Sequence, residues 1–240
     1  MKAMLKALLG RTPYRVSRRG AANRFQAIED CLQSLRAREY RPRIVIDGGA
    51  HVGEFSLMAK RHFPDAAFHL FEPQQACVDA MRKVCAAEGF VPHVCALAER
   101  GGTLRFSRTS RPDTGAMVAI AERPDTTEVT ACSLDDVFRG KVDRDDRVLL
   151  KLDLQGYELQ ALKGAADLLR SVEVVLSEVS FYIQSYAASL AELLAFLNGS
   201  GFELYDIASL SARPRDNRPR EADFVFVRND SLLLQDSRWD

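Results

Sequence analysis

Short apolar runs alternate with amphipathic stretches through most of the chain. The apolar runs cover residues 43–47, 67–71, 91–95, 148–152 and 172–176. Between them, apolar residues recur at helical spacing over residues 54–62, 75–88, 157–169 and 189–197. Short apolar runs separated by helices are typical of parallel strands that are buried on both faces. The pattern therefore predicts an α/β fold with helices on both faces of a mostly parallel sheet.

Further elements flank this alternating region. Residues 23–38 show helical spacing, and residues 202–206 and 223–228 are apolar runs joined by a polar loop. The two late runs predict an antiparallel pair at one edge of the sheet. The expected organisation has three parts: a helical segment over 1–40 that serves as a substrate lid or interface, one α/β domain over 41–230, and a tail over 231–240.

An insertion over residues 101–130 interrupts the alternation with hairpin-like pieces, such as residues 103–107. Ser133 then has the position of a helix N-cap, and an acid at Asp136 is favourable in the first turn of that helix. Asp135 and Asp136 therefore have a structural role, and we do not assign them to a functional site.

A glycine-rich turn follows the first apolar run. It comprises Asp47, Gly48, Gly49, Ala50 and Gly53, in the spacing D-x-G-x-x-x-G. Glycines allow the backbone to turn sharply and to approach a ligand closely. The spacing differs from the G-x-G-x-x-G that places a pyrophosphate at a helix N-terminus. The turn suits a ligand without phosphates, such as S-adenosylmethionine, whose ammonium can pair with Asp47; a tight turn without any ligand is the alternative.

An acidic residue ends the second apolar run. Glu72, followed by Pro73, comes 19 residues after Gly53. A carboxylate at this point can accept hydrogen bonds from both hydroxyls of a ribose. Because ligands of open α/β sheets bind beyond the carboxyl ends of the strands, the glycine turn and Glu72 together predict one nucleoside site.

Two later strands also end near acidic residues. Asp153 ends the run 148–152, Glu158 opens the following helix, and Glu178 ends the strand that begins at residue 172. Each also suits a structural role. Asp153 can cap a helix, Glu158 can complement a helix dipole, and Glu178 can form an ion pair with a neighbouring strand end.

The order of these motifs resembles that of the FkbM family of methyltransferases. The matching segments run from Arg43 to Val227, about three quarters of the chain. They are VIDGGAHVGEFS, HLFEP, CSLDDVF, LKLDLQGYELQALKGA, VVLSEVSFY, LNGSGFELYDI and ADFVFV. The most specific is K-x-D-x-x-G-x-E-x-x-x-L-x-G-A, which covers Lys151 to Ala165.

The resemblance implies a Rossmann-like class I methyltransferase fold, with a seven-stranded sheet whose last two strands form the antiparallel edge. It also implies that S-adenosylmethionine is the cofactor and that hydroxyl groups of sugars or polyketides are methylated on oxygen. The expected cofactor-binding residues are Asp47, Gly48, Gly49, Ala50, Gly53, Glu72, Pro73, Ala96, Leu97 and Asp153.

For catalysis, the main requirement is to bring an acceptor oxygen in line with the methyl group and to remove one proton. Asp153 is the first candidate for the base, followed by Glu158, Glu178 and His51. In a less favoured alternative, Asp153 and Glu178 hold a Mg²⁺ ion that lowers the pKa of the acceptor hydroxyl.

Composition and charge narrow the classes of partner, metal site and cellular location that the sequence allows. Basic and acidic residues number 33 each, which argues against nucleic acid as a partner. Five cysteines without a C-x-x-C pair indicate reduced thiols, and the four histidines lack the spacing of zinc ligands. Since no apolar run approaches the ~18 residues of a membrane span, we expect a cytoplasmic protein without integral membrane contact.

The expected partner is a small-molecule or saccharide acceptor, and a homo-oligomer remains open. Two other functions compete with methyl transfer. A catalytically silent module that binds S-adenosylmethionine would keep the glycine turn and Glu72 without a working acceptor site. An NAD-dependent oxidoreductase is disfavoured by the glycine spacing.

Overall fold

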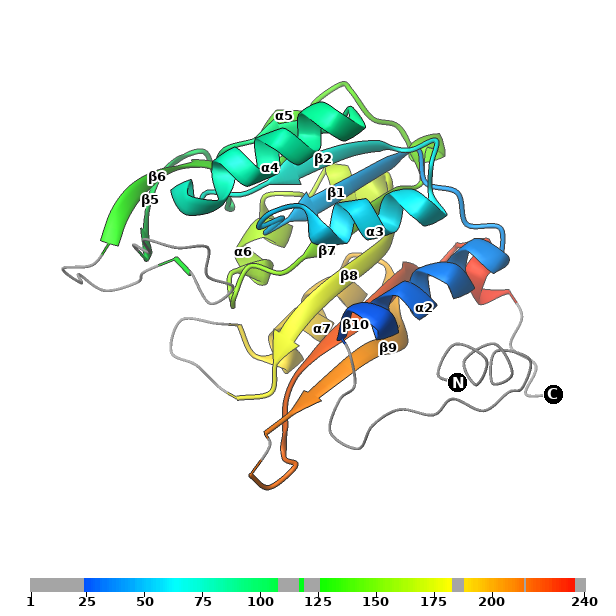
Figure 1. The fold of residues 1–240 in the computed structure, drawn as a ribbon. Helices are drawn as coiled ribbons and strands as arrows, with labels where there is room; N and C mark the ends of the chain where they lie inside the picture. Colours follow the sequence, from blue (N-terminus) through cyan, green and yellow to red (C-terminus); the bar gives the residue numbers. More distant parts are fainter. Residues whose placement is uncertain (1–23, 108–116, 119–125, 183–187, 214, 236–240) are drawn as a thin grey trace, which may run out of the picture.

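A seven-stranded sheet forms the centre of the molecule (Figure 1). The computed structural model describes residues 24–107, 117–118, 126–182, 188–213 and 215–235. The strand order is β3-β2-β1-β7-β8-β10-β9. The strands are β1 (Ile44–Gly48), β2 (Ala67–Phe71), β3 (Val91–His93), β7 (Val148–Leu152), β8 (Val172–Ser180), β9 (Phe202–Ala212) and β10 (Pro219–Arg228).

The pairing register brings the ends of the central strands to one edge. β1 runs parallel to β2 and β7, with Gly48 opposite both Phe71 and Leu152. The segments that follow these three strands therefore start side by side. β10 runs antiparallel to β8 and β9, and Asp223 lies opposite Glu178. The prediction of a mostly parallel sheet with an antiparallel pair at its edge is confirmed.

Six α-helices of the described residues cover the two faces of this sheet (Figure 1). One core contains apolar residues of α2 (Arg24–Ala37), α3 (Glu54–His62) and α4 (Gln75–Glu88). The other contains apolar residues of α5 (Leu134–Phe138), α6 (Glu158–Lys163) and α7 (Leu190–Gly199). Neighbouring strand residues alternate between the cores, as Val45 and Ile46 do, because side chains point to opposite faces.

A second, three-stranded sheet lies beside the main one, in the order β4-β6-β5. It consists of β4 (Ala96–Leu97), β5 (Gly102–Ser107) and β6 (Thr126–Cys132). The strand predicted over 91–95 is present and pairs with β2, but β3 ends at His93, two residues earlier than predicted. The chain then leaves the main sheet, and β4 pairs with β6. Of the predicted insertion, residues 108–116 and 119–125 lie outside the described residues.

The helix predicted over 157–169 is shorter than expected. α6 ends at Lys163, and a separate 3-10 turn covers Leu168–Arg170. A Cβ atom added at Gly164 would lie 2.1 Å from the Ala98 carbonyl oxygen. The chain therefore passes close to the segment after β4 at this point, a long-range contact that helical periodicity does not record. Two further 3-10 turns cover Arg144–Asp146 and Leu232–Leu234.

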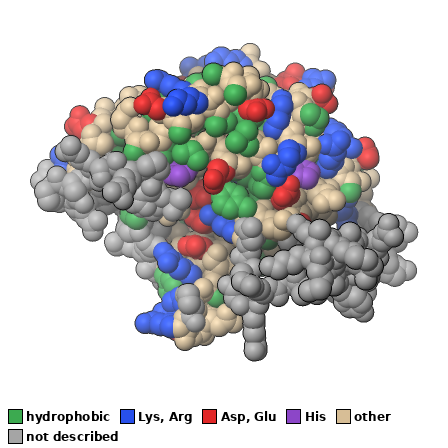
Figure 2. Space-filling model, viewed as in Figure 1, with side chains coloured by type: hydrophobic (Ala, Val, Ile, Leu, Met, Phe, Trp, Pro, Cys, Tyr) green, Lys and Arg blue, Asp and Glu red, His purple; other side chains and the backbone are tan. Residues whose placement is uncertain are grey.

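Charged side chains of both signs are interspersed over the upper part of the molecule, as Figure 2 shows. No helix of the described part of the chain combines the length and apolar character that a membrane crossing requires. Residues 1–23 of the predicted N-terminal segment and 236–240 of the predicted tail lie outside the described residues.

Candidate functional site

The glycine turn after β1 is packed tightly against the segment after β7. Gly49 has φ +71°, and a Cβ atom there would lie 1.9 Å from the Asp153 carbonyl oxygen. At Gly48 it would lie 2.8 Å from the Leu97 side chain. His51 also has a positive φ, at 53°. Both the backbone conformation and the close packing therefore require glycine at position 49.

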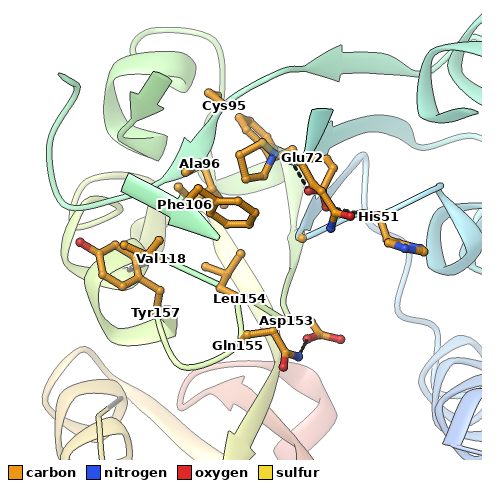
Figure 3. A pocket seen from close by; sticks show the side chains of 15 residues that line it. His51, Glu72, Cys95, Ala96, Phe106, Val118, Asp153, Leu154, Gln155 and Tyr157 are labelled. Carbon is orange, nitrogen blue, oxygen red and sulfur yellow. Dashed lines mark hydrogen bonds between the residues drawn. The ribbon is translucent and has the colours of Figure 1, made fainter. Parts of the chain in front are cut away.

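Glu72 points toward this turn (Figure 3). Its Oε2 accepts a hydrogen bond of 2.8 Å from the backbone N–H of His51, and its Oε1 accepts one of 2.7 Å from that of Gln74. Burial raises the pKa of the Glu72 carboxyl, and the two backbone hydrogen bonds act against that rise. Each oxygen still has a second lone pair, so the carboxylate can accept hydrogen bonds from a ligand as well.

A cavity opens beside Glu72, and we call it the glycine-turn cavity (Figure 3). It encloses about 620 Å³ of space that includes open solvent. Six of the predicted cofactor-binding residues line it: Gly49, Glu72, Pro73, Ala96, Leu97 and Asp153. Its apolar wall also includes Phe71, Phe106 and Leu154. The cavity thus joins an apolar wall, suited to a flat ring, to a carboxylate suited to hydroxyl groups.

The sequence predicts that Asp47 pairs with the ammonium of the cofactor, but in the structure it pairs with Lys151. Its carboxylate is fully buried. Oδ1 accepts a hydrogen bond of 2.9 Å from Lys151 Nζ, and Oδ2 accepts one of 2.7 Å from Ser56 Oγ. Lys151 also donates to the carbonyl oxygens of Gly48 and Gly49. In the structure this ion pair holds the turn, and Asp47 does not line the glycine-turn cavity.

Two other predicted cofactor-binding glycines lie close to apolar side chains. Gly48 lies between the side chains of Leu97 and Leu152, and Gly53 has φ +91° beside Val84. Neither lines the glycine-turn cavity. Ala50 lines a neighbouring cavity instead.

This second cavity encloses about 1190 Å³ of space that includes open solvent, and we call it the acidic cavity. Its acidic side chains are Glu54, Asp153, Glu178 and Glu221. Its basic side chains are Arg24, Lys151 and Arg220, and Phe25, Ile28 and Phe55 are apolar. Four residues line both cavities: Gly49, His51, Asp153 and Gln155. A ligand in one cavity can therefore meet a ligand in the other at these residues.

Arg24 of α2 lines the acidic cavity and contacts carboxylates of β8, β10 and the segment after β7. Its Nε and Nη2 bind the two carboxylate oxygens of Asp223, at 2.7 and 2.6 Å. Nη2 also lies 3.0 Å from Asp153 Oδ2, and Nη1 lies 3.0 Å from Glu178 Oε1. Sequence reasoning missed Arg24 and Asp223, because nothing local distinguishes this arginine from its basic neighbours.

The two carboxyls beside Arg24 differ in their affinity for protons. Burial disfavours the charged form of Asp153, but Lys151 and Arg24 outweigh it and lower the pKa of Asp153. Burial and the neighbouring Asp153 raise the pKa of Glu178 to about 9. The Gln155 side-chain amide donates to both residues, at 2.9 Å each. Of the two carboxyls, Glu178 therefore holds a proton more strongly and Asp153 more weakly.

Three of the four predicted catalytic residues meet around the acidic cavity, namely His51, Asp153 and Glu178. The buried Nε2 of His51 has no hydrogen-bond partner among the described residues. Glu158 lies apart from them. Its Oε1 accepts hydrogen bonds from the backbone N–H groups of Leu154 and Gly156, and it holds the loop after β7. Burial raises the pKa of Glu158 to about 7.

Metal-ligand geometry is not found in the described part of the chain, where no three His, Cys, Asp or Glu side chains form a group that could hold a metal ion. The oxygens expected to hold Mg²⁺ instead contact the guanidinium of Arg24. The cation between Asp153 and Glu178 is thus the guanidinium of Arg24.

Comparison with known proteins adds to this geometry. Residues 47–204 match the methyltransferase FkbM domain. A related protein, methyltransferase sdnD of Sordaria araneosa, is 29% identical over 197 residues, which cover 67% of this chain and 73% of that protein.

Two solved structures align with this chain. Methyltransferase FkbM of Methylobacillus flagellatus KT aligns with a TM-score of 0.48 at 17% identity, over 76% of this chain and 43% of that chain. WbdD aligns with a TM-score of 0.50 at 14% identity, over 94% of this chain and 47% of that chain. The chain thus spans less than half the length of either protein.

The family match covers most of the sheet and the segments that line the glycine-turn cavity. The strand order, with β10 as the antiparallel strand, and the helices on both faces match the α/β fold that the FkbM resemblance implies. The chain therefore belongs to the FkbM family of S-adenosylmethionine-dependent methyltransferases.

Proposed function

We propose that the protein binds S-adenosylmethionine in the glycine-turn cavity and transfers its methyl group to a hydroxyl oxygen of a small molecule or sugar in the acidic cavity. One observation carries this proposal: the two cavities meet at Gly49, His51, Asp153 and Gln155. A donor and an acceptor bound in them would come together at that junction. Holding two reactants in line can lower a barrier by roughly 7–11 kcal/mol in favourable cases.

In the donor site, the Glu72 carboxylate would accept hydrogen bonds from the ribose hydroxyls. The adenine would pack on the wall of Ala96, Leu97 and Phe106, all of which line the glycine-turn cavity. The methionine part would extend toward Gly49 and Asp153, which also line that cavity. This assignment uses the predicted contacts that line the glycine-turn cavity and leaves out Asp47, Gly48, Ala50 and Gly53, which do not line it.

At the junction, Asp153 is the proposed base. The acceptor oxygen forms a bond with the methyl carbon as the bond from that carbon to sulfur breaks, and the hydroxyl proton passes to the Asp153 carboxylate. The lowered pKa of Asp153 keeps it charged at neutral pH. Glu178 is protonated there and can donate a hydrogen bond to a second oxygen of the acceptor. A positioned base typically contributes ~100- to 10,000-fold in rate.

His51 is a second candidate for the base, since its Nε2 lacks a partner in the described structure. Mg²⁺ between Asp153 and Glu178 is the less favoured route, because Arg24 already contacts both carboxylates. α2 would form part of the acceptor site, since Arg24, Phe25 and Ile28 line the acidic cavity.

Donor binding is the first test. Titration calorimetry with S-adenosylhomocysteine should show binding to the intact protein, whereas NAD should give no heat. Glu72→Gln should weaken that binding by tenfold or more, because hydrogen bonds to a charged acceptor contribute about 1.5–3 kcal/mol each. Asp65→Asn changes an exposed acid two residues before β2; it is the control and should bind normally. A Glu72→Gln protein that binds normally would remove Glu72 from the donor site.

Methyl transfer is the second test. A panel of hydroxylated small molecules and saccharides, assayed with labelled S-adenosylmethionine, should include a methylated product. Asp153→Asn should then lose most of the turnover while retaining donor affinity. If the donor binds and no acceptor in the panel is methylated, the result favours a silent binding module.

A further inference from the structure

Two cysteines meet at the wall of the glycine-turn cavity. Cys95 precedes β4 and Cys132 ends β6, and these strands pair in parallel with Leu97 opposite Cys132. Their Sγ atoms lie 2.6 Å apart, and both thiols are free. The other three cysteines, Cys31, Cys77 and Cys85, are buried. The strand pairing therefore holds one pair of thiols within reach of a covalent bond.

The two thiols of this pair are not equivalent. Cys95 is buried and lines the glycine-turn cavity next to Ala96 and Leu97 (Figure 3). Cys132 is partly exposed but does not line that cavity. The hydrogen bond between them lowers the pKa of Cys95 and raises that of Cys132. We assign the attack to Cys95 because it lines the cavity, and the resolving step to Cys132 because its sulfur lies 2.6 Å away.

We propose that Cys95 and Cys132 form a reversible modification site, in which a peroxide converts the two thiols to a disulfide in the wall of the methyl-donor cavity. The formation of the disulfide does not depend on the proposed function, whereas its coupling to the methyl donor rests on it.

The reaction balances with hydrogen peroxide as the oxidant. The Cys95 thiolate attacks one peroxide oxygen, the O–O bond breaks, and after protonation the products are water and a sulfenic acid on Cys95. The Cys132 sulfur then attacks the Cys95 sulfur and displaces a second water. Two thiols are oxidised by two electrons in total, and one peroxide is reduced to two waters. A dithiol reductant reverses the step by thiol–disulfide exchange.

The position of Cys95 makes the modification responsive to the donor site. A ligand in the glycine-turn cavity would cover the route by which peroxide reaches the Cys95 sulfur. With S-adenosylhomocysteine at ten times its Kd, about one protein molecule in eleven is unliganded, so oxidation should slow by about tenfold. Any change in ligand affinity caused by the disulfide must appear reciprocally as a change in the stability of the disulfide.

The experiment treats the purified, reduced full chain with hydrogen peroxide, with and without S-adenosylhomocysteine. Intact mass should fall by two hydrogen atoms, and titratable thiols in denaturant should fall from five to three, since two of the five cysteines are consumed. Peptide mapping should locate the bridge between Cys95 and Cys132, and dithiothreitol should restore all five thiols.

Two variants sharpen the test. Cys132→Ser should form no bridge and should accumulate a Cys95 sulfenic acid that a dimedone probe traps. Cys31→Ala removes a buried cysteine of α2 and should form the bridge as the unmodified sequence does. Retention of five thiols after peroxide, or a bridge that maps to other cysteines, would overturn the proposal.

The proposed link between disulfide formation and binding of the methyl donor is tested separately. If calorimetry shows that S-adenosylhomocysteine binds but oxidation is not slowed, Cys95 does not face the bound ligand and the coupling is wrong. If S-adenosylhomocysteine does not bind, the proposed function fails, while mass and thiol counts still decide whether the disulfide forms.

Discussion

At the scale of single residues, Arg24 determines the charge of the candidate acceptor site. It contacts carboxylates of β8, β10 and the segment after β7, and its side chain is 29% exposed. Burial opposes its charge, but the hydrogen bond to Asp223 and the nearby carboxylates raise its pKa. Removal of one partner from a buried ion pair leaves the other charges uncompensated, which costs more than the pair itself contributes.

Arg24→Ala should therefore lower the free energy of unfolding by about 3–5 kcal/mol at pH 7, since it leaves Asp153 and Asp223 without their cation. Urea denaturation measures this difference. Arg43→Ala, which removes a largely exposed arginine, is the matched control and should change stability by at most about 1 kcal/mol. Equal losses in the two variants would contradict the role assigned to Arg24.

Glu178 should make stability depend on pH. Burial and the neighbouring Asp153 raise its pKa in the folded protein to about 9, from an ordinary value of 4.5. Between these two values the folded state binds the proton that the unfolded state releases, so this group lowers stability as pH rises. Glu178→Gln mimics the protonated acid and should remove up to ~1 kcal/mol per pH unit of that decline. Urea denaturation from pH 6 to pH 9 measures it, and unchanged slopes would show that Glu178 is ionised in the folded protein.

At the scale of elements, the glycine turn and the segment after β7 form one packed unit. Gly49 combines φ +71° with a Cβ position 1.9 Å from the Asp153 carbonyl oxygen. Lys151 adds hydrogen bonds to the carbonyl oxygens of Gly48 and Gly49. The turn thus depends on β7 for its shape, and both cavities share the junction formed there.

Gly49→Ala should abolish S-adenosylhomocysteine binding and destabilise the protein, because the added carbon overlaps backbone atoms that cannot move independently. Gly89→Ala is a closely matched control, with φ +74° and no heavy atom within 4 Å of the added Cβ. Gly89→Ala should lower the free energy of unfolding by only about 1 kcal/mol, because a residue with a side chain is less stable in a left-handed conformation. Thermal unfolding measures the stability of the two variants, and calorimetry measures their affinity for S-adenosylhomocysteine. Similar results for both variants would show that close packing at Gly49 is unimportant.

At the scale of the whole molecule, α2 is integrated into the α/β domain. Ile28, Leu32 and Leu35 are buried in the same core as residues of α3 and α4. Tyr40, just after α2, is fully buried, and its hydroxyl donates to the Arg147 carbonyl oxygen. The helix that reaches the acidic cavity therefore also completes one face of the sheet.

A chain that begins at Arg41 should be strongly destabilised relative to the full chain. Loss of the buried leucine and isoleucine side chains costs about 1.5–3 kcal/mol each, which is comparable with the whole stability of a typical domain. We expect no cooperative thermal unfolding transition near that of the full chain. A shortened chain that unfolds at the same temperature would show that residues 1–40 form a separate segment.

Much of the fold could be predicted from the sequence. Helices α3 and α4 and strands β2 and β7 have the predicted boundaries, because local apolar periodicity reports burial on one or both faces. The break after His93 and the early end of α6 could not be predicted in this way. Both depend on contacts with segments distant in sequence, the pairing of β4 with β6 and the approach of Gly164 to Ala98.

The functional residues likewise fall into two groups: those that the sequence predicts and those that only the tertiary structure identifies. Placement of Gly49, Glu72, Asp153 and Glu178 at one sheet edge follows from the sequence alone, because the end of each parallel strand marks that edge. The tertiary structure decided which charges meet there: Arg24 reaches Asp153 and Asp223 across 129 and 199 residues, and Lys151 reaches Asp47 across 104. Periodicity records which side of an element is buried but not which distant element covers it, so only the folded chain assigns these partners.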